Sequence, residues 1–256
     1  MTGASGGLGH AIARTLHARG ATVLLTARRA DVIARLRFQL GDRAELYPAD
    51  LADRDAVGDL AERAGRVDLL VSNAGIPASG PLLSYEPAEI DRALDVNLRA
   101  PMQLALALAP AMVERGAGHL VFISSTAGKV ASPGSSVYSG TKFGLRGFAF
   151  GLREDLHGTG VGVTTVFPGF IRDAGMHHDS GVRLPAYIGT RTPDQVANAV
   201  VKGVERGRAE IDVAPLPLLA GGWVAGLAPS ALAALQRRLG GDRISKAFGD
   251  AQRSKR

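Results

Sequence analysis

The chain of 256 residues contains no cysteine, so neither a disulfide framework nor a thiolate metal site can form. It also lacks the basic stretch and apolar core of a secretion signal, because Met1 runs directly into a Gly-rich segment. Both absences suit a reducing compartment, and we expect a cytoplasmic protein. No internal repeat or low-complexity block interrupts the chain, which predicts a single folded unit.

Aromatic residues make up only 5% of the chain, and no stripe of basic residues interleaved with aromatic ones is present. This absence argues against nucleic acid as a partner, despite a net charge of +6 and a pI of about 10. Basic residues look scattered, and only the tail at 252–256 clusters them, which is typical of a solvated terminus. The positive charge also suits a membrane surface or an anionic cofactor.

Charge is missing altogether from the segment Leu216–Leu235. Pro217, Pro229 and several glycines argue against a membrane-spanning helix. An apolar segment of this length is costly in water, so we expect it to line the substrate opening or a subunit interface, or to touch a membrane surface. The chain is therefore interpreted as a catalytic unit at 1–213 followed by an apolar extension with a basic tail at 214–256.

Short apolar runs alternate along the chain with longer segments whose apolar residues recur at helical spacing. The short runs are continuously apolar, which is typical of strands covered on both faces. The alternation predicts an α/β fold, a Rossmann-like, doubly wound parallel sheet with helices on both faces. Helices are expected around Leu8, around Val57 and from Pro193. The expected strands are Thr22–Thr26, Ala44–Tyr47, Asp68–Ser72, His119–Ser124, Gly162–Phe167 and Glu210–Val213.

The first candidate site is the Gly-rich segment Thr2–Gly9, which leads into a helix. Glycines let backbone N–H groups approach a pyrophosphate, and the helix start adds partial positive charge. Plain strand-to-helix turns share this pattern, so the segment alone is weak support for a nucleotide site. The cofactor-binding residues predicted here are Gly3, Ser5, Gly7, Leu8 and Gly9.

Arg28 and Arg29 follow the strand expected at Thr22–Thr26, where a dinucleotide fold faces the adenosine ribose. An acid at this place would bind a free 2′-hydroxyl, whereas an Arg pairs with a 2′-phosphate. Arg28 therefore favours NADP(H), with NAD(H) still possible. The alternative is that both arginines simply begin the next helix at the surface.

Tyr138 and Lys142 lie four residues apart on an expected helix, so their side chains share a face. A free phenol titrates near 10, and work near neutral pH requires its pKa to fall by about three. The Lys142 ammonium together with an oxidised nicotinamide could supply that change. Ser125 comes just after an apolar strand, where its hydroxyl could hold a substrate oxygen.

Taken in order, these motifs resemble the short-chain dehydrogenase/reductase family, in its subgroup of about 250 residues. The likeness covers about residues 1–213. It implies that Tyr138 is the acid/base, that Ser125 polarises the carbonyl, and that Lys142 lowers the Tyr138 pKa and binds the nicotinamide ribose. The matching residues are Gly3, Gly7, Gly9, Asp50, Leu51, Asn73, Ala74, Gly75, Asn97, Ser125, Tyr138, Lys142, Pro168 and Gly169.

The resemblance implies further roles. Asn97, in a long helix, would hold a water that links Lys142 to solvent, and Asp50 and Leu51 would contact adenine. Asn73, followed closely by Gly75, would support the central strands beside the cofactor. Pro168, Gly169 and Ile171 would flank the nicotinamide ring.

Two departures from the family pattern follow Ile171. The family often has a Thr shortly after this place, and the sequence Arg172-Asp173-Ala174 leaves its carboxamide contact unassigned. His177 and His178 have no third ligand nearby, so we interpret them as a loop over the substrate and expect no metal.

The leading hypothesis is an NADP(H)-preferring oxidoreductase that interconverts a ketone and a secondary alcohol on a hydrophobic or medium-sized small molecule. We expect a homodimer or homotetramer. A 3-oxoacyl thioester reductase acting on a carrier protein is the nearest alternative, and the basic charge would suit it. A non-catalytic NADP(H)-binding sensor or scaffold is disfavoured, because a pure binder has no use for the set Asn97, Ser125, Tyr138 and Lys142.

The family also has an apolar strand before the Gly-rich turn, and Met1 stands where that strand should end. The strand is central in the order 3-2-1-4-5-6, so the strands at Thr22–Thr26 and Asp68–Ser72 would lose their shared neighbour. Each unpaired buried group costs about 1–3 kcal/mol, against a total stability of about 5–15 kcal/mol. We therefore expect a marginal chain and a short apolar extension upstream in the natural protein. The alternative is a true variant whose flanking strands close up.

Overall fold

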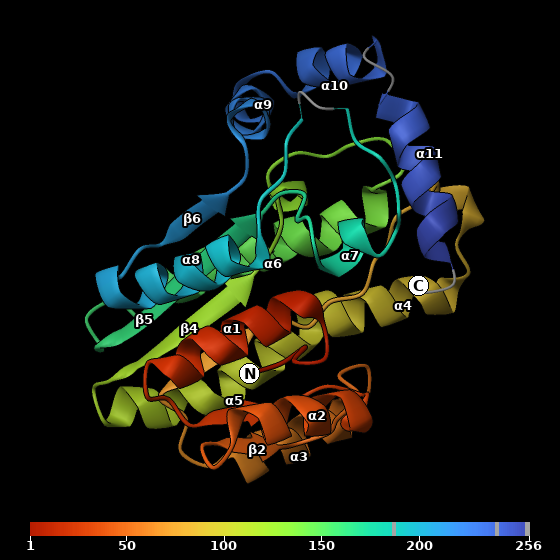
Figure 1. The fold of residues 1–256 in the computed structure, drawn as a ribbon. Helices are drawn as coiled ribbons and strands as arrows, with labels where there is room; N and C mark the ends of the chain where they lie inside the picture. The colour runs from red at the N-terminus through yellow and green to blue at the C-terminus, as the bar shows by residue number, and fades with distance from the viewer. Residues whose placement is uncertain (186–187, 239–240, 254–256) are drawn as a thin grey trace.

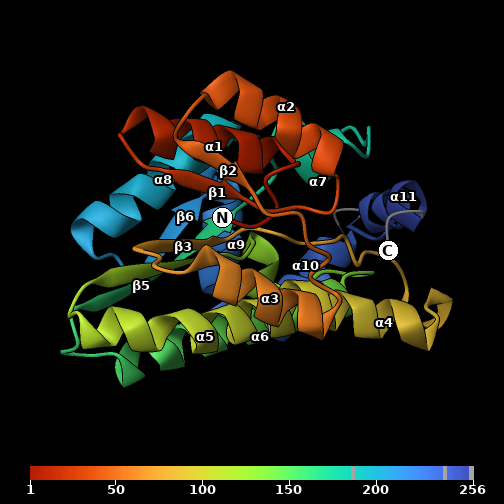
Figure 2. The ribbon, with the colours of Figure 1, turned by 90° about the horizontal axis from the view of Figure 1, so that it is seen from below.

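A computed structural model describes residues 1–185, 188–238 and 241–253. It confirms the expected α/β fold, with helices covering both faces of parallel strands (Figures 1 and 2). All six expected strands are present, and their ends differ from the predicted ones by no more than one residue. They are β1 Val23–Leu25, β2 Ala44–Leu46, β3 Leu69–Ser72, β4 Gly118–Ile123, β5 Val161–Pro168 and β6 Glu210–Val213.

The sheet is divided into two parts, because no full strand of the described residues lies between β1 and β3. β1 pairs only with β2, whereas β3, β4, β5 and β6 form a four-stranded sheet in that order. The parts are linked through Met1 and Thr2, because Thr2 N donates to the Val71 carbonyl and Thr26 N donates to the Met1 carbonyl, each at 3.0 Å. This link lies where β1 and β3 end, beside the Gly-rich turn.

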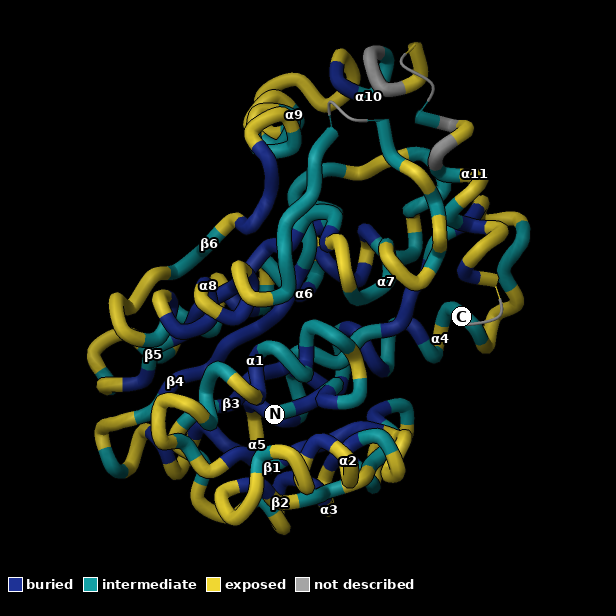
Figure 3. Tube along the Cα trace, viewed as in Figure 1, coloured by how far each residue is buried: buried dark blue, intermediate teal, exposed yellow. Residues whose placement is uncertain are grey.

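Two helical layers enclose the four-stranded sheet (Figure 2). One layer consists of α1 and α8, the helices expected around Leu8 and from Pro193. The apolar core beneath this layer includes Ile12, Val196 and Val200. The other layer packs Leu104 and Leu145 against β4, and burial is greatest along this sheet (Figure 3). The helices are α1 Gly7–Ala18, α2 Ala30–Leu40, α3 Arg54–Ala64, α4 Pro87–Leu94, α5 Ala100–Glu114, α6 Ser136–Asp155, α7 Gly175–His178 and α8 Pro193–Arg206.

The helical run Pro87–Glu114 joins α4 to α5 through a π-helical turn at Asp95–Arg99. By length and composition this run is apolar enough to cross a membrane. Half of its most apolar stretch is buried inside the protein. Its apolar character is therefore explained by its place in the core.

Three further helices follow β6: α9 Leu216–Leu227, α10 Pro229–Arg238 and α11 Gly241–Gln252. α9 and α10 stand away from the main body, and α11 returns toward α7 and α4 (Figure 1). Gln252 Nε2 donates to the Met176 carbonyl at 3.1 Å, and the Phe248 ring stacks on Phe170 at 5.8 Å. The C-terminal segment thus reaches over the edge of the sheet at which β5 ends.

Candidate active site

The Gly-rich turn brings three stretches of backbone into close contact. Gly3 has a φ of +68°, and a Cβ there would lie 2.8 Å from the backbone of Ala74. A Cβ on Gly9 would lie 2.2 Å from the Gly3 carbonyl oxygen. Only glycine fits either position, so the turn can pack directly on the first turn of α1 and on the segment after β3.

The start of α1 is shaped to receive an anion. Its N-cap is Gly6, which supplies no capping side chain, and no acidic residue stands in the first turn. The first backbone N–H groups of a helix have no partner within the helix and carry partial positive charge. The residues present therefore fit the pyrophosphate of a dinucleotide, which Gly7, Leu8 and their neighbours would hold.

Asn73 and Thr2 together fix this turn to β3. Asn73 Nδ2 donates to the carbonyls of Thr2 and Gly3, at 3.1 and 3.2 Å. In return the Thr2 hydroxyl accepts from the backbone N–H groups of Asn73 and Ala74, each at 3.1 Å. Asn73 thus lies where the resemblance implied, whereas sequence reasoning missed Thr2.

Asn97 lies in the π-helical turn between α4 and α5 and is fully buried. Its Oδ1 accepts from Ile76 N at 2.8 Å, and its Nδ2 donates to the Ile76 carbonyl at 3.0 Å. A Cβ on Gly75 would lie 3.3 Å from Asn97 Oδ1 and 3.6 Å from Lys142 Nζ. The structure therefore brings Gly75, Asn97 and Lys142 together, and the water-holding role of Asn97 stays a prediction.

Ser125 follows β4, and its hydroxyl accepts a hydrogen bond from Ala127 N at 3.1 Å. Its side chain also lies close enough to Tyr138 to oppose the rise that burial causes in the pKa of that phenol. Tyr138 and Lys142 lie one turn apart on α6, with Lys142 Nζ 5.7 Å from the centre of the Tyr138 ring. Gly128 permits this arrangement, because a Cβ there would lie 2.7 Å from the Lys142 carbonyl. Three of the four predicted catalytic side chains therefore meet at the carboxyl end of β4.

The expected lowering of the Tyr138 pKa is not produced by the protein's own groups. Burial raises the pKa of Tyr138 to about 12, and the hydrogen bond with Ser125 opposes that rise. Burial also lowers the pKa of Lys142 to about 8, and the ammonium donates to the Ile123 carbonyl at 3.1 Å. The expectation combined the Lys142 ammonium with an oxidised nicotinamide, so it stays a prediction for the cofactor-bound protein. In the protein alone, the loss of hydration disfavours charge on both groups.

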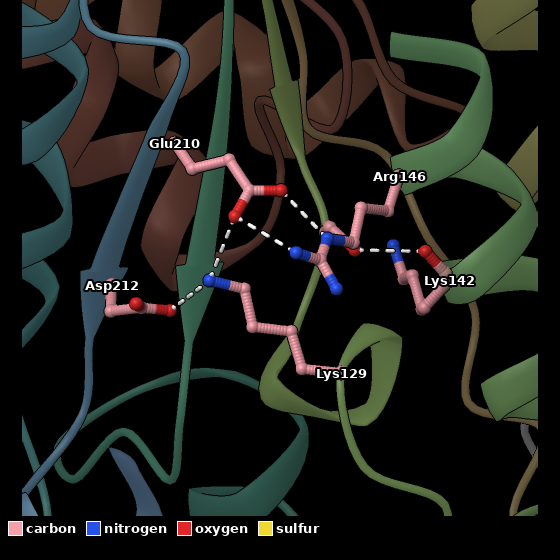
Figure 4. Close-up of polar contacts among 6 residues, drawn as sticks. Lys129, Lys142, Arg146, Glu210 and Asp212 are labelled. Carbon is pink, nitrogen blue, oxygen red and sulfur yellow. Dashed lines mark hydrogen bonds and ion pairs between the residues drawn. The ribbon is translucent and has the colours of Figure 1, made fainter. Parts of the chain in front are cut away.

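A charged cluster holds the turn after Ser125 to the last strand (Figure 4). Lys129 ends this turn and pairs with Glu210 at 3.1 Å and with Asp212 at 2.8 Å. Arg146 on α6 donates two hydrogen bonds to Glu210, at 2.6 and 3.1 Å. Burial alone would raise the pKa of Glu210, but the hydrogen bonds from Arg146 and Lys129 lower it. The cluster therefore fixes Ser125 and α6 against the same strand, and sequence reasoning missed it.

The two arginines after β1 differ in their surroundings. Arg29 Nη2 donates to the Ser5 carbonyl at 2.9 Å and to the Ser5 hydroxyl at 3.3 Å, so it supports the Gly-rich turn. Arg28 is exposed, and its charge contributes to lowering the pKa of Asp50. Of the pair, Arg28 keeps its side chain toward the side where Asp50 lies.

Asp50 and Leu51 follow β2 near the same edge. Leu51 is buried, and Asp50 accepts hydrogen bonds from Ala52 N at 3.1 Å and from Arg92 at 3.2 Å. Burial alone would raise the pKa of Asp50, and these two hydrogen bonds lower it. The Asp50 carboxylate is thus held in place by α4, and its adenine contact stays a prediction.

The segment after β5 folds over the Gly-rich turn. Pro168 ends β5, and a Cβ on Gly169 would lie 3.1 Å from Leu218 on α9. Ile171 is buried, and a Cβ on Gly7 would lie only 2.2 Å from the Ala174 Cβ. Residues expected to flank the nicotinamide therefore lie beside those expected to hold its phosphates.

His177 and His178 form the end of the short helix α7. The His177 ring packs 5.4 Å from Phe170 and 5.8 Å from Phe248, and burial lowers its pKa. Among the described residues no group of three or more His, Cys, Asp or Glu is placed to hold a metal. The structure therefore places His177 in a short helix, held by its aromatic neighbours, and not in the loop that was expected.

The buried Lys142 predicts a pH-dependent stability. Its pKa is about 8 in the folded chain and 10.5 ordinarily, so between these values the unfolded chain binds the additional proton. The free energy of unfolding must then rise with pH, and the difference between the two pKa values corresponds to a gain of about 3 kcal/mol. We expect urea unfolding to show this gain between pH 8 and 10.5 in the wild type relative to Lys142→Met. Parallel stability curves for the two proteins would contradict the buried, protonated Lys142.

Comparison with known proteins agrees with this geometry. The profile of the family described as short chain dehydrogenase matches residues 1–182. A ketoacyl reductase, HetN, from a Nostoc species is 38% identical over 225 residues, which are 85% of this chain and 78% of that protein.

Solved structures show the same likeness. A short-chain dehydrogenase from Sphingobium yanoikuyae in complex with NADPH has a TM-score of 0.76 at 29% identity and covers 94% of each chain. A metagenomic short-chain oxidoreductase in complex with NADP has a TM-score of 0.70 at 36% identity and covers 84% of this chain and 95% of its own. The chain is therefore a member of the short-chain dehydrogenase/reductase family.

Proposed function

We propose that this chain is an NADP(H)-preferring oxidoreductase that interconverts a ketone and a secondary alcohol. The observation that carries the proposal is the meeting of the Ser125 and Tyr138 side chains beside the buried Lys142 at the carboxyl end of β4. Two hydroxyls at the end of a central strand suit a carbonyl oxygen placed between them. A bound nicotinamide would supply the hydride in reduction and accept it in oxidation.

Tyr138 is the proton donor in the reducing direction. With its pKa raised to about 12 by burial, Tyr138 is protonated near neutral pH. It gives this proton to the carbonyl oxygen as the carbonyl carbon becomes reduced, while the Ser125 hydroxyl holds the same oxygen. In the oxidising direction Tyr138 must first be deprotonated, and the positive charge of Lys142 favours that form.

We infer an apolar ketone or alcohol as the substrate class. A cavity of about 290 Å³ lies between residues 130–131, beyond the turn after Ser125, and the helices α9 and α10, and its lining does not include Ser125 or Tyr138. None of its lining residues is charged: Val130, Ala131, Ala225, Pro229, Ser230, Leu232 and Ala233. Such a lining offers no partner to a small anionic substrate.

A 3-oxoacyl thioester is a second candidate substrate. The observation that favours it is the name of the Nostoc relative, a ketoacyl reductase. Comparing kcat/KM for a 3-oxoacyl thioester with that for a simple apolar ketone of equal chain length separates the two candidates. Both use Ser125 and Tyr138 in the same way.

Removal of the Tyr138 hydroxyl tests the proposed chemistry. Tyr138→Phe is expected to lower kcat by about 100-fold or more, because the proton donor is lost. The Kd for NADPH should change only a few-fold, since the ring remains. Tyr47→Phe serves as the matched control and should leave kcat unchanged, because the Tyr47 hydroxyl bonds Glu45 at the surface. If Tyr138→Phe kept more than about a tenth of wild-type kcat, the assignment would be wrong.

The two arginines predict separable effects on cofactor binding. Arg28→Ala should weaken NADPH about 10-fold to 100-fold and leave NADH almost unchanged, because a charge-assisted contact is worth about 1.5–3 kcal/mol. Arg29→Ala should weaken both cofactors similarly, because Arg29 supports the Gly-rich turn. Titration of protein fluorescence with each cofactor gives both constants. Equal wild-type affinities for NADPH and NADH would refute the preference.

Helices α5 and α6 carry an exposed apolar face that we assign to a homodimer. Leu106 and Val113 lie seven residues apart on α5 and are 78% and 37% exposed. Phe143 and Phe150 lie seven residues apart on α6 and are 42% and 58% exposed. Residues seven apart share a helix face, so the two pairs form neighbouring stripes that a second copy would cover.

Charge placed on this face should separate the subunits. We expect Leu106→Glu combined with Phe150→Glu to sediment as a monomer at concentrations where the wild type is dimeric. Phe38→Glu on α2 is the matched control, because Phe38 is 88% exposed on another part of the surface. A wild type that sediments as a monomer, or a double variant that remains dimeric, would exclude this interface.

A further inference from the structure

The exposed face of α9 is apolar, the reverse of an ordinary surface helix. Among its exposed residues, Leu216 and Leu227 are 77% and 90% exposed, and no residue of α9 is buried. A surface helix normally turns polar and charged residues outward. The outward residues follow i, i+4, i+7, i+8 and i+11 and so form one stripe: Leu216, Ala220, Trp223, Val224 and Leu227.

The segment that contains this helix has an excess of basic residues. Residues 214–256 hold seven of the 30 Lys and Arg residues and two of the 24 acidic residues, so their net charge is +5. Arg237 and Arg238 are exposed on α10, which packs against α9. Three more basic residues of the described part of this segment are exposed on or just after α11: Arg243, Lys246 and Arg253.

We propose that α9 and α10 dock this protein on the surface of an anionic lipid bilayer. The outward stripe of α9 lies in the interfacial layer, and the basic residues that follow it face the lipid phosphates. With 12 residues α9 is about 18 Å long, too short for a hydrocarbon core of about 30 Å. The helix therefore lies along the surface and does not span it.

Trp223 supports a lipid interface over a protein partner. It is the only Trp of the chain and is 79% exposed, and Trp is enriched where membranes meet water. A second copy docked on the same face would bring two segments of +5 together, and their repulsion opposes that contact. An anionic bilayer offers an apolar layer and negative charge at one surface.

Docking places the apolar cavity beside the membrane. The cavity is lined by Ala225 on α9 and by Leu232 on α10, together with the turn after Ser125. An apolar substrate dissolved in the bilayer then has a short path to the site. This consequence rests on the proposed activity, whereas the docking does not.

Trp223 reports docking directly. The full chain is titrated with vesicles of equimolar phosphatidylglycerol and phosphatidylcholine, and with vesicles of pure phosphatidylcholine. We expect a blue shift of Trp emission and cosedimentation with the anionic vesicles, and binding at least about tenfold weaker to the neutral ones. No shift and no cosedimentation with anionic vesicles would overturn the proposal, whatever the activity of the protein.

Two paired variants separate the apolar and electrostatic contributions. Leu216→Ser with Leu227→Ser should weaken vesicle binding about tenfold or more, while Phe38→Ser should not. Arg237→Glu with Arg238→Glu should also weaken binding to anionic vesicles about tenfold or more. The charge-matched control, Arg54→Glu with Arg63→Glu on α3, should have little effect on that binding. Thermal unfolding confirms that each variant is folded.

Three other results would also overturn the proposal. If the variant with Leu216→Ser and Leu227→Ser bound vesicles as well as the wild type, the binding would be explained by the general attraction of a basic chain to an anionic surface. A blue shift that grows with protein concentration without vesicles would assign the face to a second copy. A larger shift with a soluble acidic carrier protein than with vesicles would assign it to that partner.

Discussion

The burial of the Lys142 ammonium constrains the site more than any other single interaction. The side chain is 3% exposed, and desolvation lowers its pKa to about 8. A buried cation must be compensated by nearby oxygen atoms, and here the Ile123 carbonyl accepts a hydrogen bond from the ammonium. Because Ile123 ends β4 and Lys142 lies on α6, the ammonium ties the central strand to this helix.

The same burial makes the charges of Lys142 and Tyr138 sensitive to whether a cofactor is bound. An ammonium with a lowered pKa gains free energy from every further acceptor that approaches it, such as the hydroxyls of a ribose. Tyr138 is held neutral by the same environment, so in the protein alone both groups resist the charge separation that catalysis needs. A bound, oxidised nicotinamide would add positive charge that favours ionisation of the phenol, which desolvation keeps protonated in the protein alone.

The strands and the catalytic triplet could be read from the sequence because each depends on local pattern. Continuous apolar runs marked all six strands to within one residue, and the spacing of Tyr138 and Lys142 placed them on one helix face. The contacts that sequence reasoning missed join distant residues: Lys129 to Glu210, Arg29 to Ser5, and Ala174 to Gly7. The raised pKa of Tyr138 in the protein alone was not foreseen for the same reason, since burial is a property of the folded chain.

The division of the sheet separates the two halves of the site physically. Ser125, Tyr138 and Lys142 are positioned by β4 and α6, and β4 pairs along its length with β3 and β5. Arg28 and Asp50 follow β1 and β2, and these two strands are joined to the larger sheet through Met1 and Thr2. Thr2 exchanges hydrogen bonds with Val71, Asn73 and Ala74, and Asn73 also donates to the Gly3 carbonyl. The candidate catalytic side chains are therefore held by a continuous ladder, whereas the adenosine side is joined to that ladder through the Gly-rich turn.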